Sequence, residues 1–168
     1  VGAALSDRDA YEPRELGEEM LRVEHFSGEG FADVTFTARR GQIIGLTGLK
    51  GCGSSELMQG LFGIHHPSGG NVEVCGKKLH GGSIHEAMGA GIAMLPADRK
   101  ENSVIPDMSL LENMYLSEHV LSARSFAINT KRENERFEKY GKLLNIKANS
   151  SADNINSLSG GNQQKVFL

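Results

Sequence analysis

The chain has 168 residues, of which 39% are apolar and 23% charged, a balance typical of a soluble globular domain. A formal net charge of −3 without any long Lys/Arg cluster argues against a nucleic-acid partner, and the apolar runs are far shorter than the roughly 20 residues that span a bilayer. Two widely spaced cysteines, six histidines outside any metal-ligand spacing and no signal-peptide pattern indicate a reduced, cytoplasmic setting without a protein metal site.

The N-terminal half has the pattern of a mixed α/β core with an antiparallel β part. Residues 1–20 carry no sustained apolar period and are predicted to form a linker. Alternating apolar and polar residues at 21–25 and 31–38, separated by a Ser-Gly-Glu-Gly turn, predict an antiparallel pair of strands. The segment 42–47 is apolar on both faces, which is typical of a central strand covered on both sides.

After residue 55 the predicted helices and strands alternate along the chain up to residue 95, and the elements that follow are all helices. In chain order they are a helix at 56–62, a strand at 71–75, a helix at 84–90, a buried strand at 92–95, a helix at 110–116 that Ser109 can cap, and a helix at 131–146 with an apolar stripe. The predicted organisation is a linker at 1–20, a mixed α/β core with a β subdomain at 21–101, a helical subdomain at 102–157, and a final segment at 158–168.

A glycine-rich loop joins the strand predicted at 42–47 to the helix predicted at 56–62. It matches the phosphate-loop pattern G-x-x-x-x-G-K-S/T at every fixed position except the lysine, where Ser54 stands. Backbone N–H groups of such a loop surround phosphate oxygens, and the following helix presents its positive end to the same anion. The residues predicted to bind nucleotide are Gly48, Lys50, Gly51, Gly53, Ser54 and Ser55, with the Ser55 hydroxyl on the Mg²⁺ that accompanies ATP.

Two interpretations of this loop stay open. In the first, the loop binds phosphate but hydrolysis is impaired, because the lysine that normally offsets phosphate charge in the transition state is absent. In the second, the loop is a glycine-rich turn without a ligand. Lys50 either replaces the missing charge or is a solvated loop residue. Cys52 is expected to be a small loop residue rather than a reactive thiol.

Residues 158–166 have the sequence LSGGNQQKV. A serine and two glycines precede a predicted helix, so that backbone N–H groups and a hydroxyl converge where an anion would bind. The string resembles the signature motif of ABC ATPases, in the form found in monosaccharide importers of the ribose, galactose and xylose type. A helix cap without a ligand is the alternative, but it accounts for only part of the string. The motif residues are Leu158, Ser159, Gly160, Gly161, Asn162 and Gln163.

The rest of the chain is similar to the second of the two fused ATPase domains in those importers. The similar segments are 21–25, 36–37, 40–45, 91–100 and 109–114. This resemblance implies a P-loop NTPase fold of the ABC ATPase type, with an α/β core, an antiparallel β subdomain and a helical subdomain. It also implies that the C-terminal part of the domain, with its Walker B acid, catalytic glutamate and switch histidine, follows residue 168, so no catalytic residue is expected within the chain.

Several positions depart from the family's pattern. Ser54 stands where the family's second domain usually has arginine, and Ala97 stands where it has glutamate, at the place of the glutamine loop. The neighbouring Asp98 is expected to be a solvated loop acid rather than a metal ligand. Phe26 and Phe31 are candidates for stacking on adenine, but either is also a candidate for the core.

The resemblance implies an ATP-binding subunit that energises monosaccharide import from the cytoplasmic face of the inner membrane, with ATP and Mg²⁺ as cofactors. Its signature motif would complete the ATP site of the first nucleotide-binding domain of the same protein. Transmembrane permease subunits would be direct partners, and a periplasmic sugar-binding protein an indirect one. Two other functions are a self-contained ATPase, which hydrolyses ATP at its own loop, and a nucleotide-independent scaffold. By itself the chain is expected to be inactive, and its residues do not identify the sugar.

Overall fold

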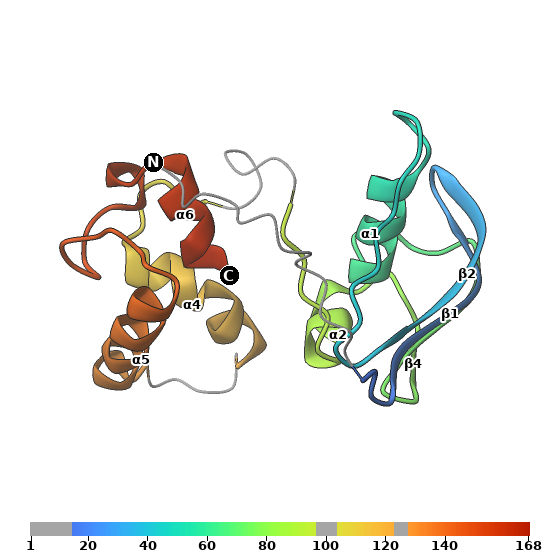
Figure 1. Cartoon of the computed structure of the whole chain (residues 1–168), viewed down its shortest axis with the longest axis horizontal. Helices are drawn as coiled ribbons and strands as arrows, with labels where there is room; N and C mark the ends of the chain where they lie inside the picture. The colour runs from blue at the N-terminus through green and yellow to red at the C-terminus, as the bar shows by residue number, and fades with distance from the viewer. Residues whose placement is uncertain (1–14, 97–103, 123–127) are drawn as a thin grey trace. The chain divides into compact units, whose positions relative to one another are not determined.

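The computed structural model describes residues 15–96, 104–122 and 128–168 (Figure 1). The chain divides into two compact units, the first ending at Ile92 and the second beginning at Ala93. Each unit is described by itself. No helix within the described residues is long and apolar enough to cross a membrane.

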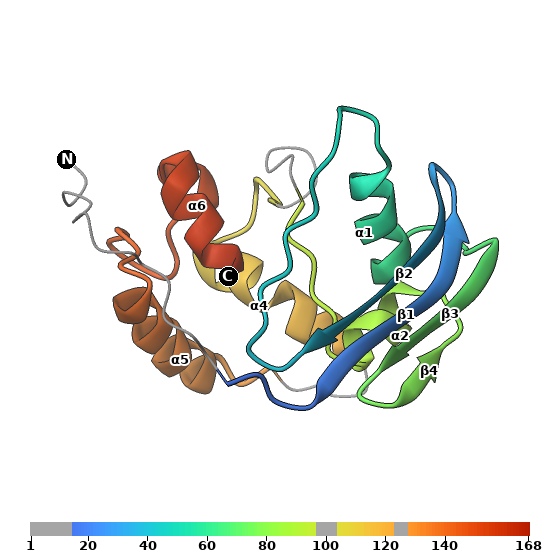
Figure 2. The same cartoon turned by 45° about the vertical axis from the view of Figure 1, so that its right-hand side comes forward.

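The first unit is built on a four-stranded antiparallel sheet with the order β2-β1-β3-β4 (Figure 2). The strands are β1 (Glu19–Gly28), β2 (Phe31–Arg39), β3 (Gly69–Val74) and β4 (Lys77–Leu79). β1 and β2 form the predicted antiparallel pair, with their turn between Gly28 and Phe31. β1 begins at Glu19, within the segment predicted as a linker, because its first residues pair with the end of β2.

Two helices, α1 (Ser54–Phe62) and α2 (Ile84–Gly89), lie on one face of this sheet (Figure 1). Both helices are predicted from the sequence, the first from its apolar spacing. The core between helices and sheet contains Val23, Phe26, Leu57, Leu61 and Val72. Burial of these side chains on both layers supplies the hydrophobic free energy that joins α1 to β1 and β2.

The strands predicted at 42–47 and 92–95 are wrong. Both segments have irregular backbone, and within residues 15–96, 104–122 and 128–168 no strand pairs with either of them. Ile43 is 87% exposed, although its predicted strand was to be covered on both faces. An apolar run becomes a central strand only when neighbouring strands bond to its backbone and other layers cover it, and such neighbours are absent from the described residues.

The second unit is helical, with α4 (Leu110–Leu121), α5 (Thr130–Leu143), a short 3₁₀ turn at Ile155–Ser157 and α6 (Gly160–Phe167). Its core contains the buried Leu110, Phe137, Ile155 and Val166. α4 extends beyond its predicted end, whereas α5 ends earlier than predicted. The early end follows from Asn145, which has a left-handed backbone with φ of 52° and stops the helix.

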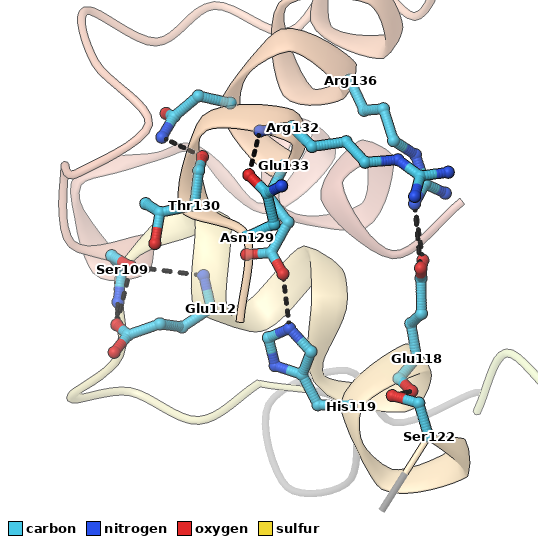
Figure 3. Close-up of polar contacts among 11 residues, drawn as sticks. Ser109, Glu112, Glu118, His119, Ser122, Asn129, Thr130, Arg132, Glu133 and Arg136 are labelled. Carbon is cyan, nitrogen blue, oxygen red and sulfur yellow. Dashed lines mark hydrogen bonds and ion pairs between the residues drawn. The ribbon is translucent and has the colours of Figure 1, made fainter. Parts of the chain in front are cut away.

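Polar contacts join α4 to α5 (Figure 3). His119 Nε2 lies 2.8 Å from Glu133 Oε1, and Arg136 Nη1 donates to both carboxylate oxygens of Glu118 at 2.9 Å. The guanidinium of Arg136 also lies over the ring of Tyr115, 5.0 Å from its centroid. These contacts fix the pairing of the two helices that flank the core of this unit.

Candidate functional site

The glycine-rich loop leads directly into α1, as the sequence predicts. The Cys52 N–H donates to the Leu49 carbonyl at 3.0 Å and closes a turn, and Gly51 and Gly53 have left-handed backbones with φ of 82° and 86°. Gly53 is the N-cap residue of α1, and its carbonyl accepts the Leu57 N–H at 2.8 Å. The loop therefore leads into the positive end of the helix by means of conformations that glycine adopts without strain.

The loop rests on the turn between β1 and β2. Gly53 is buried, and a Cβ added there would overlap the carbonyl oxygen of Gly30 in that turn. A Cβ added at Gly51 would meet nothing within 4 Å. Of these two left-handed glycines, only Gly53 is required by both its backbone and its surroundings.

The loop and the first turn of α1 carry one basic and one acidic side chain. Lys50 is exposed and is the only basic side chain between residues 48 and 56, and Glu56 adds an acid in the first turn of α1. Ser54 is half-buried and Ser55 is exposed. Hydrogen bonding with the Ser54 side chain, and then with its backbone, lowers the pKa of the exposed Cys52 thiol below its ordinary value. The residue in the lysine position thus interacts with the loop itself.

The structure decides between the two aromatic candidates only in part. Phe26 is 2% exposed and lies in the core, with its ring centroid 5.2 Å from that of Phe31. Of the two alternatives that the sequence leaves open for Phe26, the structure therefore supports a core position and not a stacking platform for adenine. Phe31 is partly buried and packs against the same core. Ala97 and Asp98, predicted as the degenerate glutamine loop, lie outside the described residues.

The signature segment begins α6. Ser159 is the N-cap residue, and the two glycines form the first turn of the helix rather than preceding it. Ser159, Gly160 and Gly161 are exposed, whereas Val166 is 2% exposed and anchors the helix in the core. The Ser159 side chain makes no capping hydrogen bond to α6, which disfavours the alternative of a simple serine cap.

Two side chains of the segment hold it to the rest of the unit. Gln163 Nε2 donates to the carbonyls of Ile155 at 3.1 Å and Leu158 at 3.2 Å. Lys165 Nζ donates to the carbonyl of Asn145 at 2.9 Å, at the end of α5. The sequence motif includes Gln163, but it does not reveal these partners, because backbone carbonyls carry no residue-specific signal.

Asn162 connects the segment to a residue that sequence reasoning missed. Its Oδ1 accepts the backbone N–H of Lys147 at 3.2 Å, and its Nδ2 donates to Ser159 Oγ at 3.2 Å. Lys147 contributes its backbone and not its side chain, so its position depends on the chain path after α5.

Comparison with known proteins identifies the family. Residues 31–168 match the family model described as "ABC transporter". The arabinose import ATP-binding protein AraG of Azospirillum brasilense is 40% identical over 171 residues, which cover all of this chain and 33% of that protein. The arabinose import ATP-binding protein AraG 2 of Burkholderia cenocepacia is 42% identical, with the same coverage. The chain thus spans about a third of the length of the curated relatives it matches.

Solved structures show the same fold. The dimeric structure of MJ0796, a bacterial ABC transporter cassette, has a TM-score of 0.68 and 20% sequence identity and covers 88% of this chain and 67% of its own. CbiO1 from Clostridium perfringens has a TM-score of 0.67 and 19% identity, and covers 89% of this chain and 60% of its own. The predicted α/β fold of a partial ABC ATPase, with antiparallel and helical parts, is confirmed. The chain belongs to the ABC transporter family, of which it carries the ATPase fold in part.

Proposed function

We propose that this chain is part of the second nucleotide-binding domain of an ATP-binding protein that energises monosaccharide import. The proposal is supported by the LSGGNQQKV segment and by relatives named for arabinose import, whose length is about three times that of the chain. Arabinose thereby joins ribose, galactose and xylose as a candidate sugar. Other subunits of such an importer would select the sugar.

The observation that carries this proposal is the exposed Ser159–Gly160–Gly161 turn at the start of α6. A helix N-terminus carries roughly half a positive elementary charge, and the adjacent Ser159 hydroxyl is not used for capping. Such a turn suits the γ-phosphate of an ATP molecule bound by a facing nucleotide-binding domain. Donors already aimed at that phosphate would stabilise charge that develops on it during hydrolysis.

The chain's own loop has a weaker claim to nucleotide. The glycine turn and the helix N-terminus fit a phosphate, but Ser54 provides no cation to offset phosphate charge. The proposed nucleotide contacts remain Gly48, Lys50, Gly51, Gly53, Ser54 and Ser55. Ser55, exposed in the first turn of α1, would hold the Mg²⁺ that arrives with ATP. This site would bind nucleotide weakly or serve a structural purpose.

The surroundings of the protein follow from the same proposal. The ATP-binding protein would lie at the cytoplasmic face of the inner membrane against transmembrane permease subunits, with the periplasmic sugar-binding protein as an indirect partner. Its first nucleotide-binding domain would receive the signature segment. Ala97 and Asp98 would be the degenerate counterpart of the glutamine loop, which in this family couples the ATP site to the membrane subunit.

The test is the ATP turnover of the full importer assembly with Ser159→Arg. The long cationic side chain would fill the space of the γ-phosphate at the N-terminus of α6, so turnover should collapse. Ser150→Arg is the matched control, since it places the same side chain at another exposed serine of the same unit. Turnover near the unsubstituted level in Ser159→Arg would overturn the proposal and favour a self-contained ATPase, whereas failure to bind ATP at all would favour a scaffold.

A further inference from the structure

The Asn162 side chain is bonded on both sides, and its two partners determine which way its amide faces. A backbone N–H can only donate, so the amide oxygen must face Lys147, as the 3.2 Å contact from Lys147 N to Asn162 Oδ1 records. The amide NH₂ must then face Ser159, 3.2 Å from its Oγ. The hydrogen-bonding network therefore settles an orientation that atomic positions alone would leave open.

This orientation determines what the Ser159 hydroxyl can do. A serine hydroxyl has one proton to donate and two lone pairs that accept. Asn162 fills one lone pair, and Ser159 Oγ neither caps α6 nor has another hydrogen-bond partner within the described residues. The hydroxyl proton thus faces away from Asn162 and is available to an acceptor outside the unit.

We infer that Asn162 is a positioning residue, which holds the Ser159 hydroxyl with its proton directed at the γ-phosphate of an ATP molecule on the facing domain. The inference rests on the proposed function and deepens it. Ser159 and Asn162 are three positions apart at the start of α6, which places their side chains on one side of the helix. A hydrogen bond from an oriented hydroxyl to a charged phosphate is stronger than one between neutral groups.

The neighbouring amide does not serve this purpose. Gln163 Nε2 donates inward to the carbonyls of Ile155 and Leu158, so the Gln163 amide holds the backbone, and no hydrogen bond joins it to Ser159 Oγ within the described residues. Within the described part of the segment, Asn162 alone connects the hydroxyl to the chain that follows α5.

A double-mutant cycle in the full importer assembly tests the inference. We expect Ser159→Ala and Asn162→Ala each to lower ATP turnover by about tenfold, because the first change removes the hydrogen bond from the hydroxyl to the charged phosphate and the second removes the bond that orients that hydroxyl. The double variant should be no slower than Ser159→Ala alone, since Asn162 acts through the serine hydroxyl. ADP has no γ-phosphate, so its affinity should be unchanged in all three variants.

A change of hydrogen-bond polarity gives a second, shape-conserving test. In Asn162→Asp the oxygen near Lys147 can still accept, but the other oxygen accepts the Ser159 proton and turns it inward, so turnover should fall by at least as much as in Asn162→Ala. Gln164→Glu is the matched control, because it adds the same charge to α6 without touching Ser159. Thermal or urea unfolding shows whether Asn162→Ala folds. If it does not, the inference is tested with Asn162→Asp instead.

The outcomes separate the inference from the proposed function. Additive losses in the double variant, or a loss in Asn162→Asp matched by Gln164→Glu, would overturn the positioning role of Asn162 and leave the proposed function standing. Full turnover in both Ser159→Ala and Ser159→Arg would overturn the proposed function and the inference together. Non-additive losses of ATP turnover, with ADP affinity unchanged, would establish the inference.

Discussion

At the residue scale, Gly53 shows how one position can be required for two physical reasons. Its backbone has φ of 86°, which is strained for any residue with a Cβ, and its hydrogen faces the carbonyl of Gly30 at contact distance. The phosphate-loop pattern predicts a glycine at this position, but not its contact with the β1–β2 turn. Through that contact the β1–β2 hairpin packs against the glycine-rich loop.

Gly53→Ala should destabilise the first unit more than Gly51→Ala does. Gly51 has a similar φ of 82° but open space around it, so alanine there should cost about 1–2 kcal/mol of backbone strain. At Gly53 the clash with the Gly30 carbonyl adds to that strain. Urea unfolding of both variants measures the difference, and equal losses would show that the contact with Gly30 contributes nothing.

At the element scale, α4 begins with a capping box. Ser109 Oγ and the Ser109 N–H both donate to Glu112 Oε2, at 2.6 and 2.8 Å, and the Glu112 N–H donates back to Ser109 Oγ at 3.3 Å (Figure 3). These bonds satisfy N–H groups that the helix start would otherwise leave without partners. The hydrogen bonds from Ser109 lower the pKa of the Glu112 carboxyl below its ordinary value of 4.5.

The capping box predicts a stability change in acid. Because the pKa of Glu112 is lower in the folded state, its carboxylate stabilises the fold above the unfolded pKa, and this contribution is lost as the pH falls through the folded pKa. Glu112→Gln keeps an oxygen acceptor but does not ionise. The stability difference between the two proteins, measured by urea unfolding from about pH 7 to about pH 3, should therefore shrink toward the acid end.

A control variant on α5 shows whether that shrinking belongs to the capping box. Glu138→Gln replaces an exposed carboxylate that makes no hydrogen bond or ion pair recorded within the described residues. The same urea series on this variant measures how much of the acid dependence comes from removing any exposed carboxylate of the second unit. If both glutamine variants behave alike, the acid dependence does not come from the Ser109–Glu112 pair.

At the scale of the whole molecule, local patterns predicted much of the fold. The β1–β2 hairpin, both helices of the first unit and the capped start of α4 follow from turn residues, apolar spacing and capping chemistry that lie within a few positions of each other. The strands predicted at 42–47 and 92–95 failed because a central strand depends on partners far away in sequence.

The candidate site likewise has features that local sequence predicts and features that depend on distant contacts. The glycine loop and the signature segment were found from sequence because their chemistry depends on residue types at fixed spacing. The sequence could not decide between the two alternatives for Phe26, and it did not indicate the bond from Lys147 to Asn162, since both depend on packing between distant segments. Long-range contacts thus determine which motif residues can face a ligand.

The most direct test of the central claim is the thiol reactivity of Ser159→Cys in the full importer assembly, with Cys52 and Cys75 replaced by serine. If the start of α6 contacts the γ-phosphate on a facing domain, a non-hydrolysable ATP analogue should slow maleimide labelling of this variant, and ADP should not. Ser150→Cys, in the same unit, should label at one rate in both nucleotides. Equal labelling of the Ser159→Cys variant with the ATP analogue and with ADP would contradict the account.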